Sequence, residues 1–582
     1  MGKNMKSRVR LGFGETEWHK VKRGVAQGAV ESPWLYSCFI DGLADELRKR
    51  DLGVMVDGVR VPLLMYADDI VMLASTVSEL RAMNDVASEY AYKHRFRHNG
   101  DKSAVMAFNA NKELSYRVAR ERWVLSGEKV EVKAEYKYLG ADILRDTTDW
   151  RTHINRLIKK AGNRSRDLLW ICRKDKGIRP RSAATLWKSI VRPVLEYAAE
   201  LWSGDIPKSL ADKAEQVQTD FARGVLGLQG QRAISNDFVR TEMGLEKLAA
   251  RWEKLRLGYW RKIQAARPGR LLTKVARMRM GQVRWGMSRL GELSWMKGTR
   301  SLLTSRGLAR YWYDPARAKA KTKERWKKLV YLQVEEHFEQ ERDKRSRGLV
   351  SLARYNSIKH WGPMDTDRAQ FVGEVGRHGA LVVERYLDDV KDGLGRQLKL
   401  MCRADCLPVL SRVTWELGIS VFNAKCMMCN TGHTEDVKHL LLQCPAYQRQ
   451  RERMMETAER AFAGAGFSDL SESERVCALL GARAGSCAAE DRVDVMVKRF
   501  LRKAWKIRGR VTRAVNDEFG RQDLVWAKGG GWSNPTPKIC KKDNGKGKKA
   551  GKERGFAAKA IHVTQDEGER QAKLPVRRRL FT

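Results

Sequence analysis

The chain has 582 residues, enough for about three or four domains of roughly 150 residues each. Its 113 Lys and Arg residues outnumber 70 Asp and Glu residues, giving a net charge of +43 and an isoelectric point near 10.0. The positive side chains repel one another unless a polyanion neutralises them. Nucleic acid is such a polyanion, because Lys and Arg bind its phosphates well. The longest apolar runs fall short of the roughly 18 residues of a membrane-spanning helix, and no apolar signal segment opens the chain, which argues against a membrane partner.

The first 145 residues alternate short apolar runs with helical stretches, which predicts an α/β region. Within it, the loop Lys22–Gly28 precedes Ser32 and Pro33. The glycines of this loop allow the backbone to approach a ligand closely. Ser32 is expected to cap a helix whose first residue is Pro33. This helix is expected to bury a stripe formed by Leu35, Phe39, Leu43 and Leu47.

Two apolar runs flank the sequence Tyr66-Ala67-Asp68-Asp69, which predicts a β-hairpin with Asp68 and Asp69 at its turn. Adjacent carboxylates repel each other, and a divalent cation such as Mg²⁺ turns that repulsion into binding because it prefers oxygen ligands. Two such ions would stabilise the attacking and leaving oxygens of a phosphoryl transfer. An Asp-Asp pair taken alone more often makes a solvated turn, so the interpretation depends on the neighbouring motifs.

From about residue 150 to 400 the sequence becomes helical, basic and rich in Trp. Residues 207–228 have the period of a helix, with apolar residues at Leu210, Ala214, Val217, Phe221 and Val225. The segment 318–328 combines Lys and Arg with Trp326, which suits phosphate contact and base stacking, although a solvated helix face explains it equally well. Another helix is predicted near 491–508, with an apolar face of Val493, Val497, Phe500, Leu501 and Ala504. Its basic residues are expected to face away, at Lys498, Arg499, Arg502 and Lys503.

Ten cysteines in a chain of this size do not suggest a secreted disulfide scaffold, and three of them lie between residues 426 and 444. The ligand types and their spacing predict a structural Zn²⁺ site in a reducing compartment, formed by Cys426, Cys429, His439 and Cys444. His433 is the alternative histidine, but it follows a glycine in a predicted turn, so His439 is preferred. Cys402 and Cys406 have no complementary pair of ligands and are interpreted as core thiols.

The composition shifts to Gly, Lys and Pro from Lys528 onwards, which predicts a disordered basic tail. A short basic run at 573–579 is a candidate signal for nuclear import. Together with the reducing environment that the cysteines indicate, it places the chain in the nucleus and cytoplasm and not outside the cell.

The motifs of the first 230 residues, in their order and spacing, resemble those of reverse transcriptases from LINE-type (non-LTR) retrotransposons. Tyr66–Asp69 resembles the palm signature of that family, which implies that Asp68 and Asp69 are catalytic and hold Mg²⁺ or Mn²⁺. The loop Lys22–Gly28 resembles the one that faces template and nucleotide. The resemblance therefore implies nucleic-acid or nucleotide binding by Arg23, Gln27, Gly28 and Tyr66.

Later segments continue the resemblance. Asn99–Ser103 resembles the element whose lysine, here Lys102, helps to protonate the pyrophosphate leaving group. Tyr136–Gly140 resembles the primer-grip hairpin, and His153 follows it as in LINE polymerases, where we expect it to be structural. Residues 191–202 resemble the start of the thumb. The Cys-Cys-His-Cys segment resembles the zinc knuckle near the C-terminus of LINE proteins.

The resemblance implies an α+β fold, with a partial reverse-transcriptase palm, an all-α thumb and linker region, a small zinc knuckle and a disordered tail. The expected boundaries are 1–145 for the partial palm, 146–235 for the thumb, 236–420 for the linker, 421–450 for the knuckle, 451–525 for a C-terminal helical segment and 526–582 for the tail. The fingers and the third metal-binding carboxylate of the family precede the loop at Lys22, and the residues before that loop contain no match for them.

The function implied is RNA-directed DNA polymerase of a non-LTR retrotransposon, acting on an RNA template and a DNA primer or target. Because the third carboxylate has no match, we expect the chain to be N-terminally truncated and inactive on its own. The alternative is a non-catalytic relic of such an element that still binds nucleic acid. A zinc-containing nucleic-acid-binding protein unrelated to polymerases would leave the order of the motifs as coincidence.

Overall fold

The protein is mixed and rich in helix, with small sheets near its N-terminus. The computed structural model describes residues 6–20, 25, 28–108, 110–146, 149–174, 178–204, 206–229, 231, 234–284, 294–347, 355, 358–359, 382–389, 392–412, 424–429, 431–462, 466–481 and 487–519. The expected basic tail, Arg23 and Gln27 lie outside the described residues. Among the helices that are described, none is long and apolar enough to cross a membrane.

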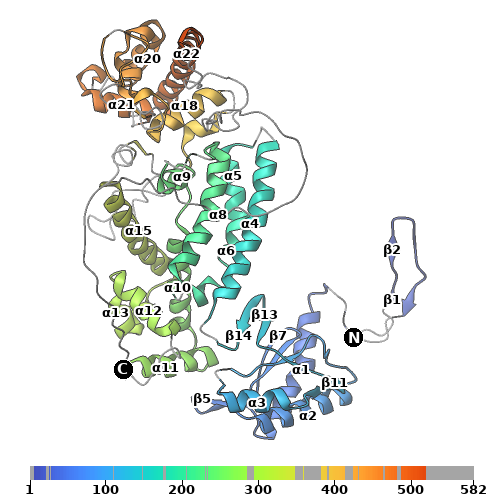
Figure 1. The fold of residues 1–582 in the computed structure, drawn as a ribbon. Helices are drawn as coiled ribbons and strands as arrows, with labels where there is room; N and C mark the ends of the chain where they lie inside the picture. Colours follow the sequence, from blue (N-terminus) through green and yellow to red (C-terminus); the bar gives the residue numbers. More distant parts are fainter. Residues whose placement is uncertain are drawn as a thin grey trace, which may run out of the picture. The chain divides into compact units, whose positions relative to one another are not determined.

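The N-terminal region consists of short strands and three helices (Figure 1). Its strands are β1 (Lys6–Ser7), β2 (Arg10–Leu11), β3 (Gly14–Glu15), β4 (His19–Lys20), β5 (Val54–Val56), β6 (Val59–Val61), β7 (Leu63–Tyr66), β8 (Asp69–Met72), β9 (Ala104–Val105), β10 (Val124–Leu125), β11 (Glu128–Lys129), β12 (Glu131–Val132), β13 (Glu135–Tyr138) and β14 (Ala141–Leu144). Its helices are α1 (Ser32–Lys49), α2 (Val77–Lys93) and α3 (Lys112–Arg120). Every sheet in the described residues has two strands, which are antiparallel except for the parallel pair β9 and β12.

Helix α1 differs from its prediction at both its start and its buried face. The helix begins at Ser32, and its N-cap is Glu31, which makes no side-chain capping bond. Leu35 and Phe39 remain 38% and 42% exposed, whereas the buried residues are Ile40, Leu43, Ala44 and Leu47. Each four-residue step overshoots the 3.6-residue turn, so the first member of a stripe spaced by four rotates well away from the last. The buried residues pack against α2 and its neighbouring strands in one core.

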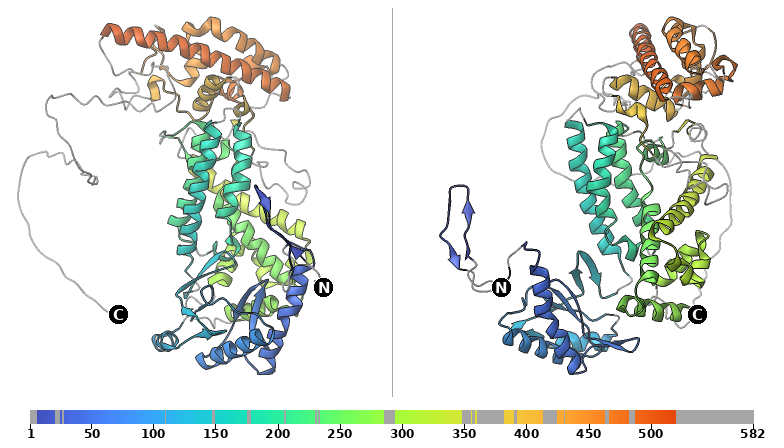
Figure 2. Two further views of the ribbon diagram at one scale, coloured as in Figure 1. Left: turned by 90° about the vertical axis from the view of Figure 1, so that its right-hand side faces the viewer. Right: turned by 180° about the vertical axis from the view of Figure 1, so that it is seen from behind.

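The next part of the chain is helical and is built around two long helices. It contains α4 (Arg151–Lys174), α5 (Pro180–Leu186), the π-helix η1 (Trp187–Val191), α6 (Arg192–Leu195), α7 (Ala199–Trp202), α8 (Lys208–Leu226) and α9 (Asn236–Glu242). Helices α4 and α8 lie side by side (Figure 2). A Cβ at Gly224 would lie 2.5 Å from a side-chain methyl of Leu169, so a larger residue there would force this leucine to move. The predicted helix is confirmed, with Leu210 and Phe221 buried.

A second group of helices encloses a separate core rich in aromatic residues. Its members are α10 (Leu248–Ala265), α11 (Leu271–Arg284), α12 (Ser294–Ser305), α13 (Ala309–Tyr313), α14 (Pro315–Ala320) and α15 (Lys323–Arg347). Trp326 is 1% exposed, and its indole Nε1 donates to the carbonyl of Leu257 at 3.1 Å. The proposed stacking of nucleic-acid bases on Trp326 is therefore wrong, because the ring fills the core between α10 and α15.

The C-terminal helices share one core with α4–α9. They are η2 (Arg385–Asp388), α18 (Gly393–Arg403), η4 (His439–Gln443), η5 (Pro445–Tyr447), α20 (Gln448–Ala461), η6 (Phe467–Asp469), α21 (Glu472–Leu480) and α22 (Cys487–Phe519). All five residues of the predicted apolar face on α22 are buried, at Val493, Val497, Phe500, Leu501 and Ala504. Lys498 is an error in that prediction: it is 2% exposed, and its Nζ lies 2.6 Å from carboxylates of Asp389 and Asp494. These acids turn a lysine beside the apolar face inward.

A buried ion network crosses the same core. The guanidinium of Arg403 donates to both carboxylate oxygens of Glu242, at 2.9 and 3.3 Å, and lies 3.2 Å from Glu384. Lys359 pairs with Glu384 at 2.7 Å, and the hydroxyl of Tyr386 donates to Glu242 at 2.5 Å. Two acidic and two basic side chains thus neutralise each other in the protein interior. Removing one of them would leave a buried charge without its partner, which lowers the stability of the fold.

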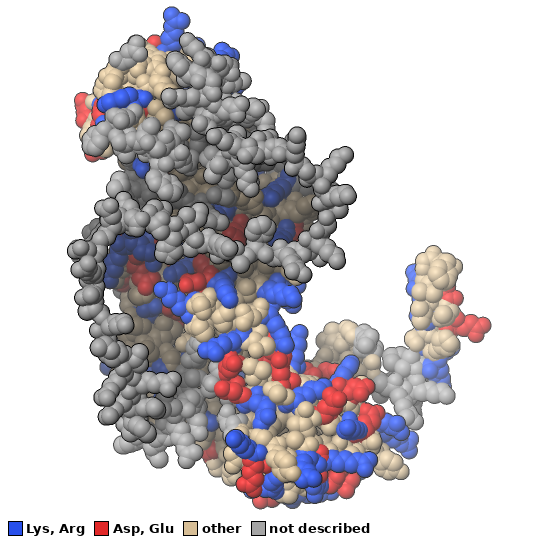
Figure 3. Space-filling model, in the orientation of Figure 1, with Lys and Arg blue, Asp and Glu red and all other residues tan. Residues whose placement is uncertain are grey.

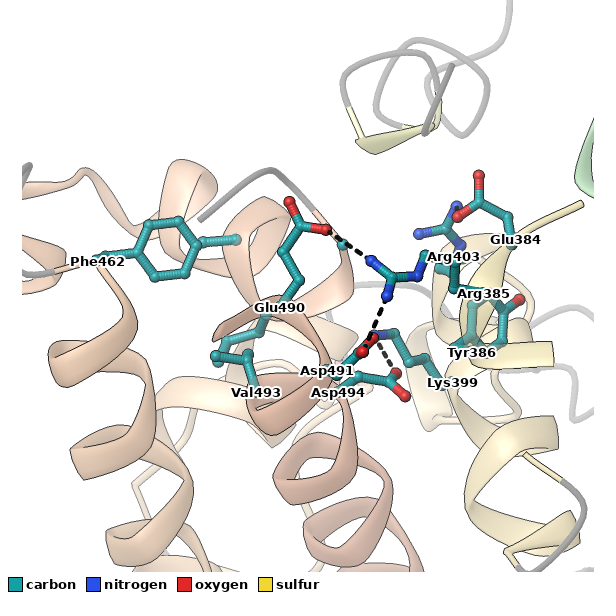
Figure 4. Close-up of a pocket in the computed structure, with 13 residues that line it drawn as sticks. Glu384, Arg385, Tyr386, Lys399, Arg403, Phe462, Glu490, Asp491, Val493 and Asp494 are labelled. Atoms are coloured by element: carbon teal, nitrogen blue, oxygen red, sulfur yellow. Dashed lines mark hydrogen bonds and ion pairs between the residues drawn. The ribbon is translucent and has the colours of Figure 1, made fainter. Parts of the chain in front are cut away.

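A small pocket lies beside this network (Figure 4). Arg385 at its mouth points toward Asp491 at 2.9 Å and Glu490 at 3.8 Å, while Lys399 contacts Asp494 at 2.7 Å. Its charged walls are therefore paired with one another, and we assign it a structural role.

Candidate functional site

The Asp68–Asp69 segment forms a tight hairpin turn. Strands β7 and β8 pair from Leu63 opposite Met72 to Tyr66 opposite Asp69, which leaves Ala67 and Asp68 as a two-residue loop. Ala67 has φ +53°, a left-handed conformation that costs a non-glycine residue roughly 1–2 kcal/mol. Both carboxylates and the ring of Tyr66 are exposed. The turn thus presents two adjacent acids to solvent at the end of a short ribbon.

Tyr36 and Tyr138 were not predicted from the sequence to belong to this site, but the negative charge of the two aspartates changes the pKa of both. Burial, followed by the negative charge of Asp68, raises the pKa of Tyr36 on α1. Burial and the charge of Asp69 raise the pKa of Tyr138 on β13 in the same way. Both hydroxyls therefore stay protonated at neutral pH and can donate hydrogen bonds. Helix α1 and the β13–β14 hairpin consequently flank the carboxylate turn.

The other predicted binding residues are partly placed. Lys102 is exposed, and its backbone carbonyl accepts a 2.5 Å hydrogen bond from the hydroxyl of Tyr136, which joins the two later motifs. Gly28 has φ +83°, and a Cβ there would meet nothing within 4 Å. Its glycine is thus required by backbone conformation and not by crowding. Arg23 and Gln27 cannot be related to the turn because they lie outside the described residues.

The hairpin β13–β14 is tied to the helices that follow it. Asp142 contacts His153, which is buried at the start of α4, and Arg156 pairs with Asp142 and with Glu135. The hydroxyl of Tyr197 hydrogen-bonds the carbonyl of Leu139 at the tip of the hairpin. The expected structural role of His153 agrees with this placement.

A separate cysteine–histidine group lies between α18 and α20 in the chain. The ligand atoms of Cys426, Cys429, His439 and Cys444 all lie within 4.8 Å of one another. Sγ of Cys426 is 3.9 Å from Sγ of Cys444, and Sγ of Cys429 is 3.4 Å from Nε2 of His439. A tetrahedral Zn²⁺ with Zn–S bonds of about 2.3 Å would separate two sulfurs by about 3.8 Å. The group therefore fits Zn²⁺ in both ligand type and size.

The π-helical turn η4 explains how the last two ligands meet. The backbone N–H of Cys444 donates to the carbonyl of His439 at 2.8 Å, an i to i+5 bond. Four residues separate the two ligands. In an α-helix this spacing would point the two side chains apart, whereas the wider π-helical turn brings them to the same side. The rival His433 is exposed and stacks on His439, with ring centroids 5.4 Å apart.

The surroundings favour the neutral form of three of the four ligands. The exception is Cys429: burial acts to raise its pKa, but hydrogen bonds from Thr431 outweigh that effect and lower it. Burial lowers the pKa of His439, which keeps its imidazole neutral at physiological pH, as a metal ligand must be. Burial raises the pKa of Cys426 and of Cys444. Deprotonating these thiols therefore requires a cation, and Zn²⁺ supplies one.

The carboxylate turn has fewer ligands in the structure than the cysteine–histidine group has. Over the described ranges, Cys426, Cys429, His439 and Cys444 form the one group of three or more acidic, Cys or His ligands close enough to hold a metal. Glu15, an acid of the N-terminal segment, is paired with Arg8 and Arg10. Asp68 and Asp69 therefore stand as a pair.

Comparison with known proteins identifies the N-terminal region. Residues 3–143 match the family described as reverse transcriptase (RNA-dependent DNA polymerase). The chain is 27% identical over 214 residues to the RNA-directed DNA polymerase from mobile element jockey of Drosophila funebris, covering 36% of the chain and 22% of that protein. It is 32% identical over 80 residues to the retrovirus-related Pol polyprotein from type-1 retrotransposable element R2 of Nasonia vitripennis, covering 14% of the chain and 8% of that protein.

These matches confirm the family predicted from the motifs. The chain is related to the reverse transcriptases of LINE-type, non-LTR retrotransposons. The matched segments cover 22% or less of the two relatives' lengths.

Proposed function

We propose that this chain takes part in RNA-directed DNA synthesis, with an RNA template and a DNA primer or target as its partners. The observation that carries the proposal is the strained turn that exposes Asp68 and Asp69 within the segment matching reverse transcriptases. In this proposal the hairpin β7–β8 belongs to a palm, and the two aspartates hold Mg²⁺ or Mn²⁺. A bound divalent ion supplies charge stabilisation to the attacking and leaving oxygens of phosphoryl transfer.

The residues around the turn suit such a site. Burial and the charge of Asp68 or Asp69 raise the pKa of Tyr36 and of Tyr138, so both phenols stay protonated near the carboxylates. Lys102 keeps its ammonium exposed, where a polyphosphate leaving group could receive its proton. The exposed ring of Tyr66, 66% accessible, precedes the strained residue and is free to contact a nucleotide.

Metal binding at this turn can be measured separately from catalysis. Mn²⁺ in place of Mg²⁺ gives a solution electron paramagnetic resonance signal that falls as the ion binds. We expect Asp68→Asn to weaken Mn²⁺ binding by about ten-fold or more, because it removes a charged oxygen ligand. Asp57→Asn is the matched control, since Asp57 is also an exposed aspartate in a two-residue turn between antiparallel strands. Equal Mn²⁺ binding by both variants would refute the assignment of the metal site.

Primer extension on an RNA template then tests the activity itself. Incorporation that is lost in Asp68→Asn and Asp69→Asn but retained in Asp57→Asn establishes the polymerase function of this chain. Mn²⁺ binding without incorporation favours the second candidate function, which is nucleic-acid binding without catalysis.

One helix face favours this second candidate as well as the first. Along α4, exposed residues recur at alternating steps of four and three, at Lys159, Asn163, Arg166, Trp170 and Arg173. Such residues share one side of the helix, and Trp170 is 61% exposed. Figure 3 shows Lys and Arg on the visible face of the helices in the middle of the chain, with Asp and Glu among them. A basic face with an exposed indole suits phosphate contact and base stacking.

We further propose that Cys426, Cys429, His439 and Cys444 form a structural zinc knuckle. Its role would be to order the segment between α18 and α20. The geometry of the four ligand atoms supports this assignment.

A further inference from the structure

The segment from α13 to the start of α15 is strongly basic. Residues 309–328, here called the basic corner, contain two acids, Asp314 and Glu324. Against these stand eight bases: Arg310, Arg317, Lys319, Lys321, Lys323, Arg325, Lys327 and Lys328. Asp314 is paired with Arg317 at 2.8 Å, so the local excess of positive charge belongs to the remaining residues.

The aromatic residues of the basic corner sort into two groups. Tyr311, Trp312 and Trp326 are buried and anchor the segment to α10, with Tyr311 and Trp326 stacked edge to face at 5.0 Å. This anchoring directs the bases outward, so that most are exposed: Arg310, Arg317, Lys319, Lys323, Arg325 and Lys327. The helices are thereby fixed in place before any ligand arrives.

Tyr313 is the exception among these aromatics, because it is 65% exposed. Its hydroxyl accepts a 3.1 Å hydrogen bond from Nη2 of Arg300 on α12, and the guanidinium carbon lies 5.7 Å from the ring centroid. Arg300 therefore holds the ring in position from a neighbouring helix. An exposed aromatic ring that already contacts a neighbouring side chain loses less conformational entropy when a base stacks on it.

We propose that the basic corner is a binding surface for single-stranded nucleic acid, in which a base stacks on Tyr313 and phosphates contact the surrounding Lys and Arg. A single strand is favoured over a duplex because its bases have a free face for the ring. This inference rests on the proposed nucleic-acid function of the chain. It requires neither Asp68 and Asp69 nor the cysteine–histidine group.

Photo-crosslinking of the full chain to an oligouridine carrying 5-bromouridine tests the proposal at the level of residues. We expect a crosslinked peptide within 309–328 that an unlabelled single strand displaces more effectively than a duplex of the same length. Tyr313→Ala should lower the yield of this crosslink about five-fold or more, the range measured for loss of one stacked base. Tyr313→Phe should retain most of it, because the ring remains.

The matched control is Tyr116→Ala on α3. Tyr116 is 59% exposed and also lies beside an arginine, with Arg120 at 5.1 Å from its ring. The 20 residues around it, 107–126, hold four bases and two acids, against eight and two in the basic corner. This variant should leave the crosslink unchanged. A triple substitution of Lys319, Lys323 and Lys327 by Ala should lower the yield and make the remaining binding less sensitive to salt.

Three results would overturn the proposal. The first is crosslinking to other segments with none in 309–328, which would leave the proposed nucleic-acid function intact. The second is an equal loss in Tyr313→Ala and Tyr116→Ala. The third is that a polyglutamate peptide of equal charge displaces the oligonucleotide as efficiently as an unlabelled single strand does. This result would show that the surface binds any polyanion and does not recognise bases.

Discussion

Nδ1 of His153 lies 3.0 Å from Oδ2 of Asp142, and both side chains are buried. Asp142 belongs to β14 and His153 to the first turn of α4, so the pair joins the hairpin beside the carboxylate turn to the helix that carries the basic face. Arg156 lies 3.0 Å from the other oxygen of Asp142. The hairpin and α4 are therefore expected to move as one body.

Replacing His153 by Ala should loosen that hairpin. The substitution leaves the buried carboxylate of Asp142 without one of its partners, which costs about 1–3 kcal/mol. Hydrogen exchange of the amides in 135–144, followed by mass spectrometry, should accelerate by about five-fold to 100-fold. His19→Ala is the control, because His19 is exposed, and it should leave the exchange of this hairpin unchanged.

The same pair predicts a response to acid. Burial acts to raise the pKa of Asp142, but hydrogen bonds from His153 and the charge of Arg156 outweigh it, and the pKa falls below the ordinary 3.8. A carboxyl with a lowered pKa in the folded state stabilises that state above its unfolded pKa and loses the contribution as pH falls through the folded value. The thermal midpoints of wild type and Asp142→Asn should therefore differ at about pH 6 and converge toward about pH 3. A gap that widens in acid would contradict the pairing.

Arg403→Met should destabilise the C-terminal core strongly. It leaves Glu242 and Glu384 buried with one compensating cation fewer, and breaking a buried ion pair in this way costs about 3–5 kcal/mol. The urea midpoint, followed by tryptophan fluorescence, should fall accordingly. Arg48→Met makes the same chemical change at an exposed pair with Asp45, where the loss should stay below about 1 kcal/mol. Similar midpoints for the two variants would show that the network contributes little.

The cysteine–histidine group should bind about one Zn²⁺ per chain, measured by atomic emission after gel filtration. Cys429→Ser should lose the metal, because Cys429 supplies one of the four ligand atoms. His433→Ala should keep it, since His433 stacks on His439 and lies outside the ligand set. Loss of zinc in His433→Ala would mean that the two histidines exchange roles.

Binding of RNA and single-stranded DNA should show little sequence preference and depend steeply on salt. Each phosphate neutralised by Lys or Arg releases counterions, so affinity should fall sharply between about 50 and 200 mM salt. Deleting residues 528–582 should reduce the slope without abolishing binding, because the basic surfaces of α4 and the basic corner remain. Affinity insensitive to salt over this range would contradict the electrostatic basis of binding.

The amino-acid sequence by itself determined the features that depend on short-range pattern. The β-hairpin around Asp68, the apolar faces of α8 and α22, and the cysteine–histidine spacing all appear in the structure. The turn of the hairpin is one residue earlier than predicted, at Ala67 and Asp68, because Asp69 already belongs to β8. In each case the deciding interactions lie within about twenty residues, where helical period, strand pairing or ligand spacing is visible in the chain.

The tertiary structure alone decided what depends on distant segments. The sequence around Trp326 is compatible with an exposed ring that stacks on bases and with a buried ring. Its hydrogen bond to the carbonyl of Leu257 shows that the ring is buried. Lys498 turns inward because Asp389, 109 residues away, supplies a carboxylate there. Glu242 and Arg403 meet across 161 residues of sequence. A side chain's own neighbours in sequence do not encode which remote acid, base or ring will share its core, so these contacts could be known only once the chain was folded.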